Sequence, residues 1–186
     1  MKILCFGDSN TYGYDPRSYF GSQYPAQYRW VDLLARKLNC KAVNAGENGR
    51  EIPNRDAEFQ RFDLMLTNQK PLDLLIVMLG GNDLLQGNAV EAVAQRMESF
   101  LARIQLEKSK LLLIGPPRMK PGTWVTDNRL LEDCVRLNAA YRIVAEKLGI
   151  SFLDASDWDI EVTFDGIHYT EKGHQSFAEN LYLTLN

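Results

Sequence analysis

The amino-acid sequence predicts a three-layer α/β fold, in which helices cover both faces of a parallel β-sheet. Two observations support this prediction. Five short apolar segments recur along the chain without strict apolar–polar alternation, which is typical of strands buried on both faces. Longer segments between them space their apolar residues as helices do. Strands and helices therefore alternate, and this alternation indicates a parallel sheet with right-handed crossover connections.

The predicted strands are rich in leucine and β-branched residues. They cover residues 2–6 (KILCF), 41–45 (KAVNA), 72–79 (LDLLIVML), 110–115 (KLLLIG) and 150–154 (ISFLD). We expect a flavodoxin-like, doubly wound sheet with the strand order 2-1-3-4-5. A length of 186 residues fits one domain, and no linker or repeat interrupts the pattern, so we expect residues 1–186 to form a single domain.

Four segments have the apolar spacing of helices, at residues 28–38, 89–107, 129–149 and 170–185. Gly149 is suited to end the third of these helices, and Thr170 can cap the fourth. The stretch 10–27 has no assigned element and contains five aromatic residues, Tyr12, Tyr14, Tyr19, Phe20 and Tyr24. A loop of this length is usually functional. The sequence leaves open whether it forms a lip over a binding site or a contact between copies in a homo-oligomer.

The composition excludes several classes of function. Hydrophobic residues make up 45% of the chain and charged residues 24%, and 21 basic residues are spread among 24 acidic ones, so a nucleic-acid partner is not expected. The apolar stretch after Lys2 is too short for a signal peptide, and no run of residues suits a membrane span. Cys5, Cys40 and Cys134 form no metal-ligand pattern and suit reduced thiols in the cytoplasm. We expect neither a metal nor another cofactor, and we expect Cys5 to pack inside its strand.

Polar, glycine-containing segments follow several of the predicted strands. They are GDSN (7–10), GENGR (46–50), GGND (80–83) and, somewhat further along, DGIH (165–168). In doubly wound sheets, ligands bind beyond the carboxyl ends of the strands. We therefore expect these four segments to meet at one edge of the sheet.

The residues of this edge suit acyl transfer by a nucleophilic serine. Such a reaction needs a nucleophile, a base that accepts its proton and donors for the developing oxyanion. Ser9 is the only serine at a predicted strand end with glycine nearby. Asp165 precedes His168 by three residues and can bond one imidazole nitrogen, which leaves the other for Ser9. The alternative base, His174, has Glu171 three residues before it, a spacing that is typical of an ion pair on a helix surface.

Amide groups at the same edge can supply the oxyanion donors. Asn82 offers a side-chain amide, and Gly46 and Gly49 offer backbone amides that no side chain crowds. The alternative for each is a structural role as a turn residue or a helix cap, and a cap is also expected of Asp83. Asp154, at the end of the fifth predicted strand, is an alternative partner for His168. We expect Asp8 to hold its loop by accepting backbone amides.

The four segments resemble the motif blocks of the SGNH hydrolases, also called the GDSL family. FGDSNTYG is similar to the first block, NAGENGR to the second, LGGND to the third and DGIHYT to the last. The resemblance extends from residue 2 to about residue 180 and is greatest to the arylesterase and acyltransferase branch. It implies that residues 1–186 form a single catalytic domain in which Ser9 is the nucleophile, His168 is the base and Asp165 orients the base. It also implies that Ser9 and Asn82 donate to the oxyanion.

The same resemblance assigns the remaining oxyanion donor to Gly49 and leaves Gly46 to the turn. Two positions depart from the family pattern, because Asn10 replaces a common leucine and Gly81 replaces a common threonine. Both departures bear on substrate preference. We expect the substrate to be lined by Asn10, Tyr14, Gly81, Trp124 and Ile167, although Trp124 also suits an exposed packing position.

The sequence thus predicts a serine esterase that cleaves short-chain, acetyl-type esters through an acyl-serine intermediate, with a small-molecule ester as its substrate. A carbohydrate acetyl esterase of the same fold is the nearest alternative. A non-catalytic flavodoxin-like module that binds an anion or nucleotide is a second alternative. GDSNTYG disfavours it, because this segment has few small residues and no lysine to hold a phosphate. Whether water or an alcohol is the preferred acyl acceptor stays open.

Overall fold

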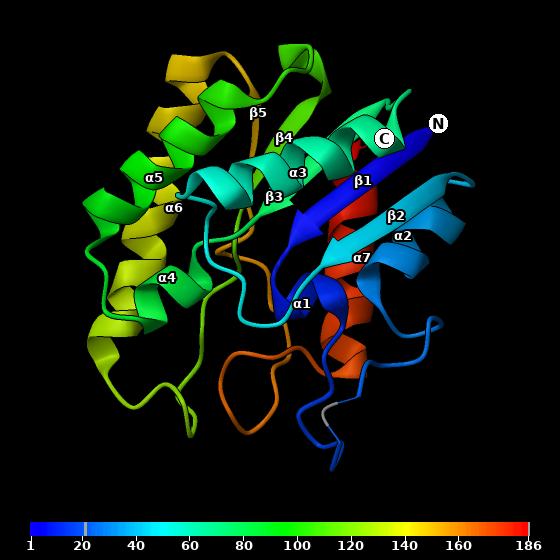
Figure 1. Ribbon diagram of the computed structural model, residues 1–186. Coiled ribbons are helices and arrows are strands. Elements are labelled where there is room, and N and C mark those ends of the chain that lie inside the picture. The colour runs from blue at the N-terminus through cyan, green and yellow to red at the C-terminus, as the bar shows by residue number, and fades with distance from the viewer. Residues whose placement is uncertain (21, 186) are drawn as a thin grey trace.

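A five-stranded parallel β-sheet lies at the centre of the computed structural model, which describes residues 1–20 and 22–185 (Figure 1). The strands are β1 (Lys2–Gly7), β2 (Lys41–Gly46), β3 (Leu74–Met78), β4 (Leu111–Gly115) and β5 (Ser151–Asp154). Their order across the sheet is β2-β1-β3-β4-β5, and each neighbouring pair runs parallel. The predicted fold class and strand order are therefore confirmed.

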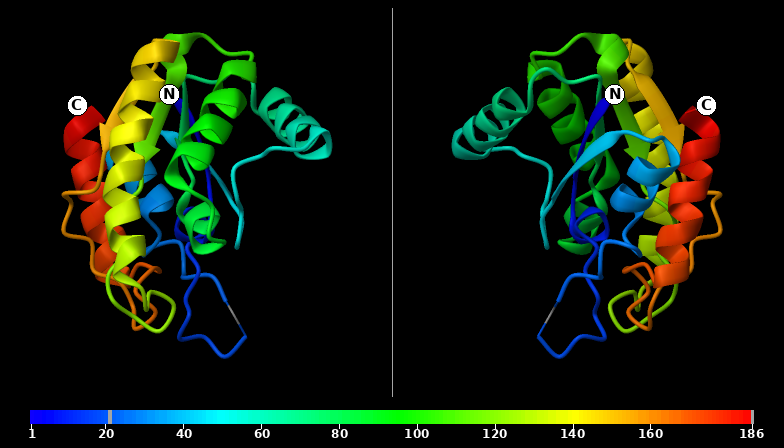
Figure 2. Two further views of the ribbon diagram at one scale, coloured as in Figure 1. Left: turned by 90° about the vertical axis from the view of Figure 1, so that its left-hand side faces the viewer. Right: turned by 90° about the vertical axis from the view of Figure 1, so that its right-hand side faces the viewer.

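Helices cover both faces of this sheet (Figures 1 and 2). One face carries α2 (Trp30–Lys37) and α7 (Glu171–Leu185), and the other carries α3 (Asp56–Gln69), α5 (Val90–Arg103) and α6 (Asn128–Leu148). The short helices α1 (Ser9–Tyr12) and α4 (Gly81–Leu85) directly follow β1 and β3, and the 3-10 turn η1 (Lys108–Lys110) precedes β4. Within residues 1–20 and 22–185, none of the helices has the length and apolar character that crossing a membrane requires.

Successive side chains of β1 enter two different apolar clusters, as in any strand that is buried on both faces. Leu4 and Phe6 pack with residues of α3, α5 and α6, whereas Ile3 and Cys5 pack with residues of α2 and α7. Burial raises the pKa of the Cys5 thiol far above its ordinary value. Cys5 is therefore a packing residue, as its place in an apolar strand predicts.

The predicted helix ends are largely confirmed. Gly149 ends α6 in the left-handed region at φ +65°, and the hydroxyl of Thr170 accepts the Gly173 amide at 3.0 Å at the start of α7. The helix predicted over 89–107 is shorter than expected, because α5 stops at Arg103. The next residue, Ile104, is extended and turns its side chain into the core.

Helix α3 was not predicted, because the apolar stripe along it is narrow. Only Phe62 and Leu66 are buried, while Leu64 is exposed. The carboxylate of Glu58 accepts the backbone amides of Asn54 and Arg55 and so fixes the first turn. Figure 2 shows α3 standing out from the body of the molecule at the end of an extended connection from β2. This connection contains the GENGR segment.

The aromatic residues of the predicted loop 10–27 separate into different environments. Tyr24 is buried, whereas Tyr19 and Phe20 are 94% and 89% exposed. The rings of Tyr19 and Phe20 contact one another edge to face, with centroids 5.2 Å apart. The described residues of this loop that follow α1 project beyond the carboxyl ends of the strands, at the bottom of Figure 2.

His174 is fully buried, so its interpretation as part of a surface ion pair is wrong. The backbone amide of Trp30 donates to its Nδ1 at 3.4 Å, and the rings of Tyr24 and Tyr169 pack edge to face against the imidazole. Glu171 pairs instead with Arg17, at 3.0 Å. Burial lowers the pKa of His174 to about 3, and the charge of Arg29 adds to this effect. His174 therefore stays neutral and belongs to the core between α2 and α7.

We predict that His174→Asn makes the protein less sensitive to acid. Asparagine keeps an acceptor for the Trp30 amide but has no group that titrates. The pKa of His174 lies near 3 in the folded protein and near 6.5 in the unfolded chain, so the unfolded chain binds the extra proton. The protein therefore loses stability as the pH falls from 6.5 towards 3. By about pH 5 the loss reaches about 2 kcal/mol of unfolding free energy.

Urea unfolding of both proteins at about pH 5 and about pH 7.5 measures this contribution. All other titrating groups are common to the two proteins, so the difference between their pH dependences isolates His174. The variant should lose about 2 kcal/mol less than the parent protein on acidification. An identical pH dependence in both proteins would contradict the buried, neutral imidazole.

Candidate active site

Ser9 lies two residues after the end of β1, as the first residue of α1. Asp8 caps this helix, because its carboxylate accepts the Asn10 amide at 2.9 Å. The expectation that Asp8 accepts a backbone amide is therefore confirmed. Burial raises the pKa of Asp8 to about 6, although the Asn10 amide and the nearby imidazole of His168 oppose that rise. The cap holds Ser9 at the carboxyl end of the sheet with its side chain buried.

A continuous chain of hydrogen bonds joins Ser9, His168 and Asp165. Ser9 Oγ lies 3.0 Å from His168 Nε2, and His168 Nδ1 lies 2.7 Å from Asp165 Oδ2. All three side chains are buried. A proton on Nδ1 that bonds the carboxylate leaves Nε2 free to accept the hydroxyl proton of Ser9. This is the arrangement that activates a serine as a nucleophile.

The carboxylate of Asp165 is held in its ionised form. Burial opposes ionisation, but hydrogen bonds from the side chain and backbone of His168 and from the backbone of Ile167 outweigh it and lower the pKa of Asp165 to about 2. The alternative partner, Asp154, lies elsewhere and bonds Arg142 at 3.2 Å and the Ser156 amide at 2.9 Å. The carboxylate beside His168 is thus that of Asp165.

The loop 165–168 is attached to the segment after β4. Lys120 donates its backbone amide to Gly166 O at 2.9 Å, and Trp124 donates to Asp165 O at 3.2 Å. Gly122 lies against the same loop, so closely that a Cβ there would be 2.4 Å from backbone atoms of Asp165 and Gly166. Only a residue without a side chain allows this approach.

Aromatic rings flank the imidazole of His168. The ring centroid of Tyr14 lies 4.8 Å away and that of Trp124 lies 5.7 Å away. Trp124 is 59% exposed. With Ser9 and Ile167, these side chains line an outer cavity of about 240 Å³. Tyr14, Trp124 and Ile167, which the sequence predicts to line the substrate, thus all line this cavity.

A smaller cavity of about 30 Å³ lies on another side of Ser9. Its lining includes Asn10 and Gly81, the two positions that depart from the family pattern, together with Met119. Leu85, Ile167, Ser9 and Asn82 line both cavities. Ser9 therefore lies between a narrow inner space and a wider outer one.

Amide donors surround the outer cavity. Asn82, in the first turn of α4, donates one Nδ2 hydrogen to Arg50 O at 2.9 Å and keeps a second hydrogen. Gly49 lines the cavity in the left-handed region at φ +72°. Gly46 lies at the end of β2, where its amide already donates to Asn44 Oδ1 at 2.9 Å. The geometry therefore favours Gly49 over Gly46 as a donor to a bound substrate.

Arg50 anchors the segment that carries Gly49, and sequence reasoning missed it. Its Nη1 donates to Gly7 O at 2.8 Å and to Ala45 O, so one guanidinium ties the ends of β1 and β2 to the loop. The same group lies over the ring of Phe6, 4.2 Å from its centroid. The signal available in the sequence was an arginine directly after the second glycine of GENGR.

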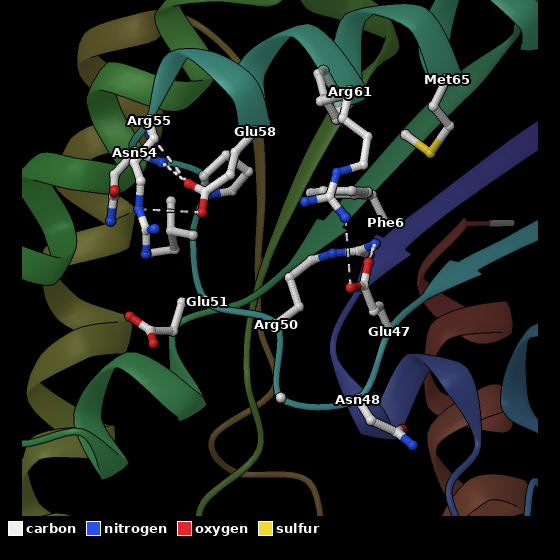
Figure 3. Close-up of a pocket in the computed structure, with 14 residues that line it drawn as sticks. Phe6, Glu47, Asn48, Arg50, Glu51, Asn54, Arg55, Glu58, Arg61 and Met65 are labelled. Carbon is white, nitrogen blue, oxygen red and sulfur yellow. Dashed lines mark hydrogen bonds and ion pairs between the residues drawn. The ribbon is translucent and has the colours of Figure 1, made fainter.

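A third cavity, of about 390 Å³, lies between this segment and α3 (Figure 3). Glu47 stands between Arg50 and Arg61, at 2.6 and 3.8 Å from their guanidinium nitrogens. Asn48 and Gly49 line both this cavity and the outer one. The GENGR segment thus separates the outer cavity from the third cavity, with little packing on either side. Its conformation therefore depends on the contacts of Arg50 and Glu47.

Asp83 fixes the chain just beyond this segment, at Ile52, and its expected role as a helix cap is wrong. The capping position of α4 is Gly80. The fully buried carboxylate of Asp83 accepts the Ile52 amide at 3.1 Å and forms an ion pair with Arg96. In the part of the chain that the structure describes, no group of three histidine, cysteine or acidic side chains is arranged to hold a metal ion.

Comparisons with known proteins agree on one family. Residues 5–176 match the sequence model of the family described as GDSL-like lipase/acylhydrolase. Esterase TesA from Pseudomonas aeruginosa is 28% identical over 166 residues, which cover 84% of this chain and 77% of TesA. The structure of a candidate arylesterase from Agrobacterium tumefaciens superimposes with a TM-score of 0.84 at 28% identity, covering 99% of this chain and 97% of that one. Est24, a carbohydrate acetylesterase from Sinorhizobium meliloti, shares the fold, with a TM-score of 0.81, 23% identity and coverage of 99% and 97%.

We predict that Gly122→Ala impairs both stability and activity. The added methyl group must push the 165–166 backbone away, which lengthens the bond between Asp165 and His168. Overpacking of this kind costs about 1–3 kcal/mol of unfolding free energy. Denaturant unfolding and the initial rate of p-nitrophenyl acetate hydrolysis measure the two effects. Gly87→Ala is the control for activity, since nothing lies within 4 Å of a Cβ at that exposed position and only its left-handed φ is strained. Equal activity of the two variants would contradict the proposed contact.

Proposed function

We propose that this chain, which belongs to the GDSL-like lipase/acylhydrolase family, cleaves short-chain acyl esters through an acyl-serine intermediate. The family and the esterase relatives make it a carboxylic ester hydrolase that acts on a small-molecule ester. The observation that carries the finer proposal is the hydrogen-bonded chain of Ser9, His168 and Asp165 at the edge of the sheet. In this proposal Ser9 is the nucleophile, His168 is the general base and acid, and Asp165 orients the imidazole.

The first half of the reaction transfers the acyl group to Ser9. Ser9 Oγ attacks the carbonyl carbon while its proton moves to His168 Nε2, and the carbonyl electron pair moves onto oxygen. The ionised Asp165 stabilises the imidazolium that results. When the tetrahedral intermediate collapses, the bond to the alcohol oxygen breaks. That oxygen takes the proton from Nε2, and the alcohol leaves.

The second half of the reaction regenerates the enzyme. A water molecule gives a proton to His168 Nε2 as its oxygen attacks the acyl carbon. The new tetrahedral intermediate releases Ser9 Oγ, which takes back the proton. The carboxylic acid is the product, and all three side chains return to their starting states.

Three amide groups would stabilise the negative oxygen of each intermediate. They are the backbone amides of Ser9 and Gly49 and the second Nδ2 hydrogen of Asn82. Support comes from their common position, since all three residues line the outer cavity. Ser9 is also the first residue of α1, where backbone amides have no partner within the helix. One such donor contributes about 3 kcal/mol to stabilisation of the transition state.

The different sizes of the two cavities support the proposal that the ester substrate has a short acyl group and a larger alcohol. The inner cavity of about 30 Å³ has room for roughly two water-sized groups, which suits an acetyl or similar acyl chain. The outer cavity of about 240 Å³ can take the alcohol. Its aromatic side chains, Tyr14 and Trp124, offer flat apolar surfaces to a ring. The exposure of Trp124 favours a carbohydrate acetyl esterase as a second candidate, because a sugar ring can pack on this side chain as an aryl ring can.

We predict that Ser9→Ala abolishes ester hydrolysis while the fold is retained. Without Oγ no acyl-enzyme forms, so kcat for p-nitrophenyl acetate should fall by at least about 10⁴-fold. His168→Ala should have a comparable effect. Circular dichroism checks the fold, and labelling by a fluorophosphonate probe should be lost with Ser9. The buried Ser156 is the matched control, because Ser156→Ala removes a hydroxyl outside the site. Full activity of Ser9→Ala would overturn the proposal.

We predict that Met119→Ala shifts the acyl preference towards longer chains. Loss of this side chain enlarges the inner cavity, so the ratio of kcat/KM for p-nitrophenyl butyrate to that for the acetate should rise at least about tenfold. Met97→Ala is the control, since Met97 is equally large and buried but lies in α5. It should lower the melting temperature and leave the ratio unchanged. The same assay with acetylated sugars separates the two candidate substrates. If Met119→Ala leaves the ratio unchanged, the inner cavity does not hold the acyl chain.

A further inference from the structure

The side chain of Asn10 bonds to the backbone on both sides of His168. Its Nδ2 donates to Ile167 O at 3.1 Å, and its Oδ1 accepts the Tyr169 amide at 3.0 Å. Two neighbouring strands of a parallel sheet bond in the same pattern. A residue on one strand donates to the carbonyl of the residue before the one that it faces, and accepts the amide of the residue after it. The side-chain amide of Asn10 therefore makes the two hydrogen bonds that a neighbouring strand would make to residues 167–169. These residues lie between β5 and α7.

The backbone groups that Asn10 bonds need a partner. His168 and Tyr169 are buried and Ile167 is half-buried, so water cannot freely replace a lost hydrogen bond there. A leucine, which is common at this position in the family pattern, could neither donate to Ile167 O nor accept from the Tyr169 amide. The carboxamide of Asn10 thus satisfies two backbone groups that leucine would leave without a partner. Asn10 also lines the inner cavity.

The backbone of Asn10 is itself held firmly. Its amide donates to Asp8 Oδ1 at 2.9 Å, and its carbonyl accepts the indole Nε1 of the fully buried Trp30 at 3.0 Å. The carboxamide therefore extends from a fixed point, one residue after Ser9. Movement of the 167–169 backbone relative to Ser9 must break at least one of these bonds.

Few of the hydrogen bonds between described residues link the two halves of the candidate triad. Among the described residues, the hydrogen bonds that join 8–12 to 165–169 involve only the side chains of Ser9 and Asn10. Asp165 holds the far side of the imidazole, and its own backbone is attached to Trp124, outside α1. The bond from Ser9 to His168 cannot hold the two residues together during the reaction, because its proton moves and Ser9 becomes acylated.

We propose that Asn10 is a positioning residue, which keeps His168 at the correct distance from Ser9 throughout the reaction. The proposal rests on the proposed triad and adds to it a residue that takes no part in the bonds that form and break. Asn10 acts through the backbone beside His168, although its side chain also lines the inner cavity. The two hydrogen bonds from the Asn10 carboxamide to Ile167 O and the Tyr169 amide form a clamp on the backbone around His168. Because the bond between Ser9 and His168 breaks and re-forms in each cycle, only a contact of this kind, to the backbone, can hold the two residues together. The Asn10 carboxamide does so from the residue next to the nucleophile.

Asn10→Asp tests the clamp with the least change in shape. At about pH 8 a carboxylate can accept the Tyr169 amide but cannot donate to Ile167 O and repels it. We expect kcat for p-nitrophenyl acetate to fall by about 10²-fold, with KM changed by less than about threefold. In this half-buried position beside the Asp8 carboxylate, the pKa of the new carboxyl group is raised above its ordinary value. Towards about pH 5.5 part of it therefore binds a proton, and its O–H can donate to Ile167 O as the amide does. The ratio of the variant's kcat to that of the parent protein should therefore rise as the pH falls.

A ratio of the variant's kcat to the parent's kcat that rises as the pH falls distinguishes a positioning role of Asn10 from a general loss of structure. Circular dichroism at each pH gives the folded fraction, and kcat is calculated per folded molecule. Asn180→Asp is the matched control. The carboxamide of Asn180, in α7, donates to Ser176 O at 3.0 Å, and Asn180 lines neither the inner nor the outer cavity. This control should lower the melting temperature and keep kcat within about twofold of the parent at every pH.

The outcomes distinguish this inference from the proposed function. If Ser9→Ala remains active, the proposed function fails. If Ser9→Ala is inactive but Asn10→Asp shows the parent's kcat with a ratio independent of pH, the role of Asn10 alone is wrong. Should Asn10→Asp fail to fold, Asn10→Ala provides the same test, with an expected fall in kcat of about 10²-fold at an unchanged KM. A rise in KM without a fall in kcat would place Asn10 in substrate binding and overturn the proposal.

Discussion

The site depends on one hydrogen bond, which joins the hydroxyl of Ser9 to the imidazole of His168 at 3.0 Å. Hydrogen bonds weaken steeply with distance and angle, so a displacement of either partner by an ångström removes the path for the proton. Many surrounding contacts serve to hold these two groups. The Asp8 cap fixes Ser9, while Asp165 and the segment 120–124 hold His168 and its loop. The parallel sheet places both groups at the same edge.

Two carboxylates close to this bond differ in their ionisation. Asp165 accepts two backbone amides and an imidazole nitrogen, and its pKa falls to about 2. Asp8 is dominated by burial, and its pKa rises to about 6. Near neutral pH the charge of Asp165 is therefore permanent, whereas the charge of Asp8 responds to the pH. The environment, rather than the residue type, suits Asp165 to stabilise an imidazolium and Asp8 to cap a helix.

The sequence was sufficient to predict the sheet and the meeting of the four polar segments, because apolar runs and the positions of strand ends are local signals. It did not predict α3, whose apolar stripe is too narrow to stand out. It misplaced His174, since a glutamate three residues earlier has the spacing of a surface pair whether or not the ring is buried. The roles of Arg50 and Asn10 could not be predicted, because their partners are backbone groups on other strands and loops. Nothing in the local sequence specifies such partners.

The order of the segments along the chain determines when the enzyme can become active during synthesis. Ser9 is 159 residues from His168, so the first strand leaves the ribosome long before the base does. All five strands precede the loop that contains Asp165 and His168. A nascent chain can therefore form most of its sheet while Ser9 still lacks its hydrogen bond to His168. Under the proposed mechanism, the protein becomes reactive only after the loop 165–168 packs against α1.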